Sequence, residues 1–151
     1  MVLSTSVRHL VPDDAEDIAA LEVDLFPDNC FNERTIRGEI EAGEGWCLRL
    51  FHGELIGYAM TRRNERLVDL TRIGVREHYR SRKHGSMLLE EVLAVAYHRG
   101  DDLILCVRKD NDLAIRWYLR RDFKVVGELG HSWVMRHYIL RDENVRPQPH
   151  L

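Results

Sequence analysis

Apolar residues along the chain follow two different periods, and the change from one period to the other marks each expected element. Alternation of period two and short apolar runs predict strands, whereas an apolar residue at every third or fourth position predicts a helix. Strands are expected over residues 6–11, 46–51, 55–61, 67–75, 103–107, 123–128 and 133–140. Helices are expected from Pro12 to the break at Pro27, and over residues 32–42, 85–98 and 112–121.

The first expected helix shows how the pattern also predicts ends and buried faces. Asp13 and Glu16 have the spacing of a capping box, in which two side chains satisfy backbone N–H groups at the start of a helix. Ile18, Leu21 and Leu25 recur at helical spacing and form one apolar stripe. We therefore expect this stripe to face the core.

The order β-α-α-β-β-β-α-β-α-β-β describes one mixed α/β domain over residues 1–140. The chain has 151 residues, of which 44% are hydrophobic and 31% charged, and this is enough for one ordinary core. Residues 141–151 contain Pro147 and Pro149 and show no apolar period. That segment is expected to be a disordered tail.

Charge and cysteine content narrow the class of function. The formal net charge of −3 argues against a general nucleic-acid binder, although basic residues gather between Arg72 and Lys83. The three cysteines fit no metal-ligand spacing, so no metal site is expected and reduced thiols in a cytoplasmic protein are the favoured interpretation. The N-terminus has no apolar stretch long enough for a signal peptide or a membrane span, and no membrane partner is expected.

The junction between the strand that ends near Val75 and the helix that begins at Gly85 is the first candidate site. A short basic turn joins the two elements, so free backbone N–H groups and the positive end of a helix dipole point at one spot. Such a spot binds phosphate oxygens. The alternative is a basic helix cap on a surface loop that holds no ligand.

The second candidate segment runs from a strand into a helix and reads Val107-Arg108-Lys109-Asp110-Asn111, followed by Ala114 and Tyr118. With the basic turn and the element order, it resembles the GNAT superfamily of acetyl-CoA-dependent N-acetyltransferases. Within that superfamily it is most similar to the branch that acetylates protein N-termini, including ribosomal-protein acetylases. The resemblance extends from Ser6 to about Leu140.

The resemblance implies a mixed sheet of about seven strands, with helices on both faces and two strands that splay apart to admit acetyl-CoA. The family's turn reads Arg/Gln-x-x-Gly-x-Gly/Ala, whereas this chain has Lys83 at the first glycine. Lysine there strains a left-handed backbone by roughly 1 kcal/mol, but it adds a cation near the phosphates. The implied acetyl-CoA-binding residues are Ile73, Val75, Arg80, Arg82, Lys83, His84, Gly85, Ser86, Asn111, Ala114 and Tyr118.

The resemblance also implies two catalytic residues. The hydroxyl of Tyr118 would protonate the leaving thiolate as a general acid, although a core aromatic residue is the plainer interpretation. Asp69 lies at the strand position where histone-type acetylases carry a glutamate base. It is either a base with a raised pKa, acting through an ordered water, or the partner of Arg72 or Arg108 in an ion pair.

Cys106 departs from the N-terminal acetylases, which often have glutamate or histidine just before the Val-Arg pair. A thiol there would serve as a nucleophile only if its pKa were depressed. A small, apolar structural residue is the favoured interpretation.

The acceptor amine is expected to enter opposite the cofactor, between residues 26–32 and the loop near 130–133, with Phe26, Phe31, Trp133 and Tyr138 as wall residues. These aromatic residues equally fit a closed core. The expected acceptor is a peptide N-terminus, and the alternatives are a small-molecule amine or a module that binds acyl-CoA without turnover. RNA contact through the basic turn is a further alternative, and the sequence leaves open whether the chain forms a homodimer.

Overall fold

The structure is a computed structural model that describes residues 5–80 and 83–139. Its strands are β1 (Thr5–His9), β2 (Glu44–Leu50), β3 (Leu55–Asn64), β4 (Leu67–Val75), β5 (Asp102–Arg108), β6 (Phe123–Leu129) and β7 (Ser132–His137). Its helices are α1 (Ala15–Leu25), α2 (Glu33–Ala42), α3 (His84–Arg99) and α4 (Asp112–Leu119), with short 3₁₀ turns η1 (Pro12–Asp14) and η2 (Glu77–Tyr79).

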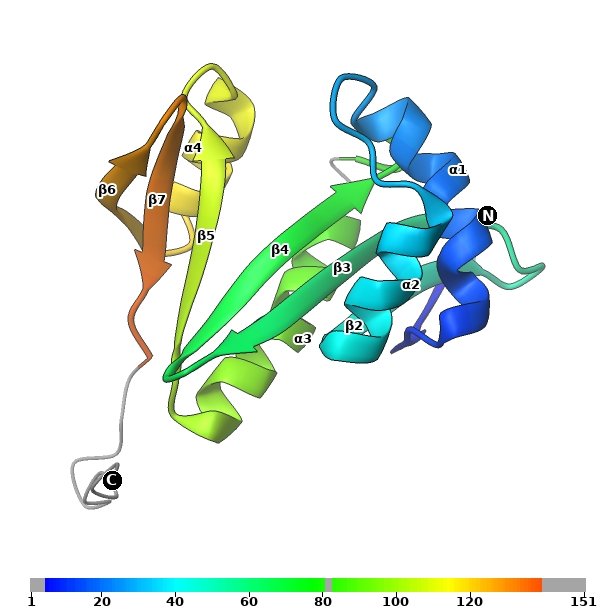
Figure 1. The fold of residues 1–151 in the computed structure, drawn as a ribbon, viewed down its shortest axis with the longest axis horizontal. Coiled ribbons are helices and arrows are strands. Elements are labelled where there is room, and N and C mark those ends of the chain that lie inside the picture. The colour runs from blue at the N-terminus through cyan, green and yellow to red at the C-terminus, as the bar shows by residue number, and fades with distance from the viewer. Residues whose placement is uncertain (1–4, 81–82, 140–151) are drawn as a thin grey trace.

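The strands form one mixed sheet in the order β1-β2-β3-β4-β5-β7-β6, and among the described strands β4 and β5 are the one parallel pair. Helices α1 and α2 pack on one face of β2 and β3, and α3 packs on the other face of β2, β3 and β4 (Figure 1). Helix α4 contacts β6 and shares a buried cluster with α3. The expected seven-stranded α/β fold with helices on both faces is confirmed.

Strands β4 and β5 part from one another after a short stretch of pairing. Their ladder ends at Asp69 and Ile104, and beyond it Figure 1 shows the two strands diverging in a V. A bulge leaves Thr71 unpaired at this point, and its hydroxyl donates a hydrogen bond to the Met60 carbonyl at 3.0 Å. A bulge bends a strand and increases its twist, so the sequence itself turns β4 away from its neighbour.

Charged residues hold the closed end of the V. Asp102, at the start of β5, accepts two hydrogen bonds from Arg136 at 2.6 and 2.9 Å and one from the Ile139 N–H at 2.9 Å. Gly100 ends α3 with a left-handed φ of 70°, as its position after the helix predicts. These contacts fasten the start of β5 to the end of β7, while β4 and β5 are joined at this end by their own ladder, from Leu67 and Asp102 to Asp69 and Ile104.

Two buried clusters lie on the two faces of the sheet. The stripe of α3, namely Leu88, Leu89, Val92 and Ala96, packs into the larger cluster. Ile18 and Leu21 of α1 pack with Ile36 and Ile40 of α2 in the smaller one. Each fully buried aliphatic side chain contributes about 1.5–3 kcal/mol, so both helix layers are firmly attached to the sheet.

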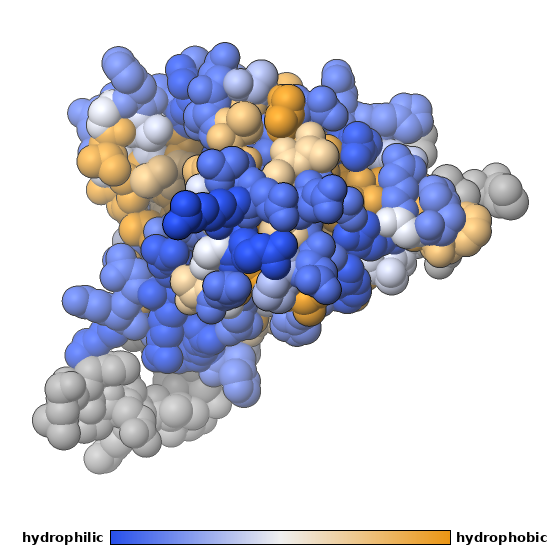
Figure 2. Space-filling view, turned by 45° about the vertical axis from the view of Figure 1, so that its right-hand side comes forward, coloured by the Kyte–Doolittle hydropathy of each residue, from blue (hydrophilic) through white to orange (hydrophobic). Residues whose placement is uncertain are grey.

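The free edge of the sheet at β6 exposes apolar side chains. Val125, Val126 and Leu129 are exposed. In Figure 2, apolar colour gathers at the upper left, on the side where β6 and β7 lie in Figure 1, whereas hydrophilic residues cover the middle of the visible face.

The expected capping box and the expected end of the last strand need correction, and the expected tail lies outside the described residues. The capping box of Asp13 and Glu16 is absent: Asp14 instead accepts the Val11 N–H at 2.8 Å, because Pro12 starts a 3₁₀ turn before α1 begins. The last strand ends at His137. The expected tail, 141–151, lies outside the described residues.

Candidate active site

The first turn of α3 has the geometry of an anion site. Lys83 precedes the helix with φ 65° and ψ 8°, and His84, Gly85 and Ser86 form the first turn. The backbone N–H groups of a first turn have no acceptor within their own helix. They point outward at the positive end of the helix dipole, which favours a negatively charged group.

Side chains around this turn fasten it to its neighbours. The Arg80 Nε donates to the Val75 carbonyl at 3.0 Å, and the His84 Nδ1 lies 2.9 Å from the Tyr79 carbonyl. Arg121 donates to the hydroxyl of Ser86. Arg82, another expected cofactor-binding residue, lies outside the described residues.

Gly85 lies close to α4. A Cβ atom at this position would lie 3.4 Å from the Trp117 ring, which is an ordinary van der Waals contact. Trp117 of α4 packs beside the first turn of α3, whereas Leu113 of the same helix is 76% exposed. The first turn of α3 and α4 are thus in direct contact.

Strand β4 presents a backbone edge to the gap. Ile73 and Val75 pack their side chains into the larger cluster on the α3 side. Beyond Asp69, the edge of β4 that faces β5 has no ladder partner among residues 5–80 and 83–139. The separated part of β4 can therefore pair with an extended ligand that carries amides.

Helix α4 supplies the next expected residues. The Asn111 side-chain oxygen accepts the Ala114 N–H at 3.2 Å, which caps the helix and leaves the amide N–H groups of Asn111 for a ligand. Tyr118 is 6% exposed and lies against Trp117 and Phe123, with ring centroids 5.1 and 5.3 Å away. Burial raises the pKa of Tyr118, so its hydroxyl stays protonated at neutral pH.

Asp69 lies at the point where the strands separate, on the face covered by α1 and α2. It is half-buried, and no hydrogen bond to its carboxylate is found in the part of the chain that the structure describes. Burial raises the pKa of Asp69, Arg62 lowers it and Glu39 raises it. Arg62 lies opposite Asp69 in the sheet, but its guanidinium donates to Glu39 at 3.1 Å.

The two arginines considered as partners of Asp69 are both engaged elsewhere. Arg72 forms a salt bridge of 2.8 Å with Glu22, and Arg108 forms one of 3.2 Å with Asp110. The ion-pair alternative for Asp69 is therefore not realised. What remains is an unpaired carboxylate with a raised pKa beside the gap.

Cys106 is exposed on β5, which differs from the expected structural packing role. Desolvation and the nearby charge of Asp69 both raise the pKa of its thiol. A raised pKa keeps the sulfur protonated at neutral pH, and the thiol, unlike the thiolate, is a poor nucleophile.

Of the four expected wall residues, only Phe26 and Phe31 are brought together. Their rings lie 3.9 and 4.1 Å from the guanidinium carbon of Arg72. Trp133 pairs with Val107 and packs against the larger cluster, on the opposite face of the sheet. Tyr138 follows the end of β7 at the closed end of the V, where Arg136 lies 4.9 Å from its ring centroid.

The face of β5 and β7 that carries Cys106 also contains two residues that the sequence interpretation missed, Val134 and Ser132. Cys106 pairs with Val134, and Arg108 pairs with Ser132. Because side chains alternate along a strand, these four lie on the face opposite Leu105 and Met135, which are buried in the larger cluster. The alternation was visible in the sequence, but the antiparallel register between β5 and β7 was not.

The gap therefore has a different set of groups on each face of the sheet. The α3 turn and Tyr118 lie on one face, and Asp69 and Cys106 lie on the other. A thioester and an amine that approach from opposite faces would meet between β4 and β5.

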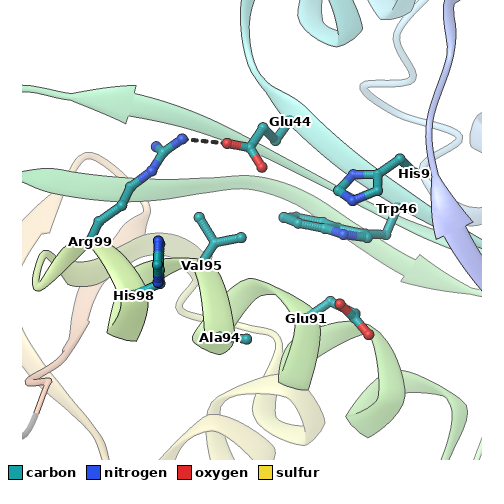
Figure 3. A pocket seen from close by; sticks show the side chains of 8 residues that line it. All are labelled: His9, Glu44, Trp46, Glu91, Ala94, Val95, His98 and Arg99. Atoms are coloured by element: carbon teal, nitrogen blue, oxygen red, sulfur yellow. Dashed lines mark hydrogen bonds and ion pairs between the residues drawn. The ribbon is translucent and has the colours of Figure 1, made fainter.

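Two other features lie apart from the gap. A hollow of about 280 Å³ between β2 and α3 is lined by His9, Trp46 and Glu91 and is flanked by the Glu44–Arg99 ion pair (Figure 3). Among the described residues, no group of His, Cys, Asp and Glu could hold a metal ion, and no helix is long and apolar enough to cross a membrane.

A family comparison matches most of the chain. Residues 10–123 match the family model described as acetyltransferase (GNAT) family. No curated protein matches the chain by sequence.

Solved structures share the fold over nearly its whole length. The ribosomal-protein-S18-alanine N-acetyltransferase from Escherichia coli has a TM-score of 0.81 at 20% identity, covering 95% of this chain and 99% of that chain. PaiA N-acetyltransferase from Thermoplasma acidophilum, solved with coenzyme A, has a TM-score of 0.73 at 19% identity, covering 90% and 99%. Nourseothricin acetyltransferase has a TM-score of 0.71 at 20% identity, covering 88% and 97%.

Proposed function

The chain belongs to the acetyltransferase (GNAT) family of acetyl-CoA-dependent enzymes, and we propose that its acceptor is the N-terminal amine of a peptide or protein. The observation that carries this proposal is the parting of β4 and β5 beyond Asp69 and Ile104. It leaves a strand edge, a helix N-terminus and an unpaired carboxylate around one gap.

The residues of one face would hold acetyl-CoA, which supplies the activated acetyl group. The N–H groups of His84, Gly85 and Ser86 suit a pyrophosphate, and the cations of Lys83 and Arg80 add positive charge beside it. The edge of β4 at Ile73 and Val75 has no ladder partner in the described part of the chain and suits the amides of the pantetheine arm, although the Val75 carbonyl already accepts a hydrogen bond from Arg80. Asn111 and Ala114, at the start of α4, line the same side.

Asp69 and Tyr118 would move the two protons of a direct transfer. Asp69 accepts a proton from the ammonium through an ordered water, because its side chain is too short for direct contact. The amine nitrogen then attacks the thioester carbonyl, the carbon–sulfur bond breaks, and Tyr118 donates its proton to the departing sulfur. The acetylated nitrogen loses its second proton to the tyrosinate, which restores the hydroxyl of Tyr118, and Asp69 releases its proton to water. The products are an acetamide and CoA.

The open face of β5 and β7 supports a peptide as the acceptor. Cys106, Val134, Arg108 and Ser132 lie along it, and within residues 5–80 and 83–139 no helix covers it as α1 and α2 cover β2 and β3. An extended segment that enters beside residues 26–32 would lie along this face. The open shape suits a peptide better than a single small amine.

A small-molecule amine is the alternative acceptor, because nourseothricin acetyltransferase has the same fold. A panel of peptides with different first residues and a panel of small amines, both scored by CoA release and by mass spectrometry, separates the two. Acetylation of peptide α-amines is the expected result. Turnover of small amines alone would contradict the proposal.

A module that binds acyl-CoA without turnover is the second alternative, favoured by Lys83 in the turn and by Cys106 in place of a glutamate or histidine. Calorimetry with acetyl-CoA, run beside the acceptor panels, tests it. Binding without acetylation of any amine would favour that module. A cytoplasmic location and a homodimer stay predictions.

A further inference from the structure

A buried carboxylate joins α1, β3, β4 and the loop that follows α1. Glu22 of α1 is 0% exposed. It accepts a hydrogen bond from the Tyr58 hydroxyl at 2.6 Å and from the Phe31 backbone N–H at 3.1 Å. Two further hydrogen bonds come from the Arg72 Nε and Nη2 at 2.9 and 2.8 Å. All of these donors converge on one charge, so the carboxylate is fully paired in the interior.

Arg72 extends this pairing to the loop of residues 26–32. Its guanidinium carbon lies 3.9 Å from the centroid of the Phe26 ring and 4.1 Å from that of Phe31, and its Nη2 donates to the Asn29 carbonyl at 2.8 Å. A planar guanidinium can use its edge for hydrogen bonds and its faces for aromatic rings at the same time. One side chain therefore holds both phenyl rings and the loop backbone.

The position of Arg72 on β4 gives this contact a functional consequence. Arg72 follows the bulge at Thr71 and lies on the same face as Asp69. The loop of residues 26–32 is therefore attached to β4, the strand that carries the candidate base Asp69, and it lies at the expected entrance for the acceptor. Because the guanidinium contacts both rings, Phe26 and Phe31 are held in place by Arg72 and do not form a freely adjustable apolar wall.

We propose that Arg72, fixed by Glu22 and Tyr58, is a positioning residue that sets the acceptor site by locking residues 26–32 against β4. This inference rests on the proposed acetyltransferase function. It predicts that loosening Arg72 impairs the use of the acceptor and leaves the use of acetyl-CoA unchanged, because the α3 turn lies on the opposite face of the sheet.

The first test is Arg72→Lys, which keeps the charge but loses the forked hydrogen bonds and the planar stacking. The matched control is Arg49→Lys. Arg49 is 16% exposed against 12% for Arg72, and it donates to the carboxylates of Asp14 and Asp17 and to a backbone carbonyl. It lies on β2, away from the gap.

The expected result is a rise of about ten-fold or more in the KM for the best peptide acceptor in Arg72→Lys, with the KM for acetyl-CoA unchanged. Arg49→Lys should leave both constants unchanged. Hydrogen exchange gives a readout independent of activity: the Phe31 amide should exchange faster in Arg72→Lys and at the wild-type rate in Arg49→Lys. Equal effects of the two lysine variants on both readouts would overturn the proposal.

If Arg72→Lys does not fold, the paired variant Arg72→Met with Glu22→Leu removes both charges and leaves no isolated buried ion. The same shift in acceptor KM is expected, and an unchanged acceptor KM would overturn the inference. If the wild-type protein acetylates no amine, the proposed function fails. Faster exchange of the Phe31 amide in the Arg72 variant would still show that Arg72 holds residues 26–32 against β4.

Discussion

Lys83 has the left-handed backbone that the phosphate turn of this family assigns to glycine. Its φ of 65° lies in a region that residues with a Cβ atom avoid, and its exposed side chain puts a cation beside the first turn of α3. Lys83→Gly therefore changes two properties at once. It relieves backbone strain and it removes a positive charge.

The two effects have opposite signs in two different assays. A left-handed residue with a side chain is strained by roughly 1–2 kcal/mol, and glycine loses about 0.5–1 kcal/mol more chain entropy on folding, so the net gain in stability is about 0.5–1 kcal/mol. For a domain of this size that raises Tm by about 1–4 °C. Loss of one solvent-exposed cation weakens phosphate binding by about 0.5–1 kcal/mol, which is a roughly two- to five-fold rise in the Kd for acetyl-CoA.

Thermal unfolding and calorimetry with acetyl-CoA measure the two effects separately. Glu65→Gly is the matched control, because Glu65 has a φ of 53° in the turn between β3 and β4, at the closed end of the sheet. It should raise Tm by a similar amount and leave the Kd unchanged. Lys83→Arg should keep both the Tm and the Kd of the wild type.

Tighter binding of acetyl-CoA by Lys83→Gly would show instead that the lysine obstructs the turn and does not attract the phosphates. A fall in Tm for Lys83→Gly, with a rise for Glu65→Gly, would show that Lys83 makes stabilising contacts that outweigh its strain.

Three further substitutions test the proposed chemistry. Tyr118→Phe should lower kcat by about 10²-fold with little change in the KM for acetyl-CoA, and an unaltered kcat with chemistry rate-limiting would remove Tyr118 from its role. Asp69→Asn should lower kcat/KM by about 10²-fold and abolish its fall at acid pH, whose midpoint in the wild type should lie above the ordinary carboxyl pKa. Because folding raises the pKa of Asp69, the wild type loses stability as the pH rises from the unfolded-state pKa of this carboxyl through its higher folded-state pKa. At pH values above the folded-state pKa, Asp69→Asn should therefore unfold at a higher temperature than the wild type. At pH values below the unfolded-state pKa it should not. Cys106→Ala should keep most of the activity, and a loss of two orders of magnitude would instead favour a covalent route through the thiol.

The periodicity of the sequence was enough to predict the helices and the strands. Ile18 and Leu21 of α1 and the stripe of α3 are buried as their spacing indicates. The helix and strand periods depend on residues that are close together in the sequence, so a short window of sequence is enough to recognise them. The separation of β4 from β5 followed from the family resemblance and not from any local pattern.

The partners of charged and aromatic side chains could not be predicted in the same way. Arg72 was considered a partner of Asp69, but it bonds to Glu22, and Trp133 was placed on the acceptor side but faces the larger cluster. The face of Arg72 depends on the bulge at Thr71, which shifts the later residues of β4 to the opposite face. The face of Trp133 depends on the register between β5 and β7, which pairs it with Val107. Contacts between segments that are distant in the sequence can be predicted only when the register of the strands is known.

The proposed cofactor and acceptor sites are tested most directly by a structure of the protein bound to CoA and a peptide. The pantetheine arm should lie between the separated parts of β4 and β5, with the pyrophosphate on the N–H groups of His84, Gly85 and Ser86. The peptide amine should lie on the Asp69 side. CoA bound away from this gap, or strands β4 and β5 paired through it, would rule out acetyl transfer between the two strands.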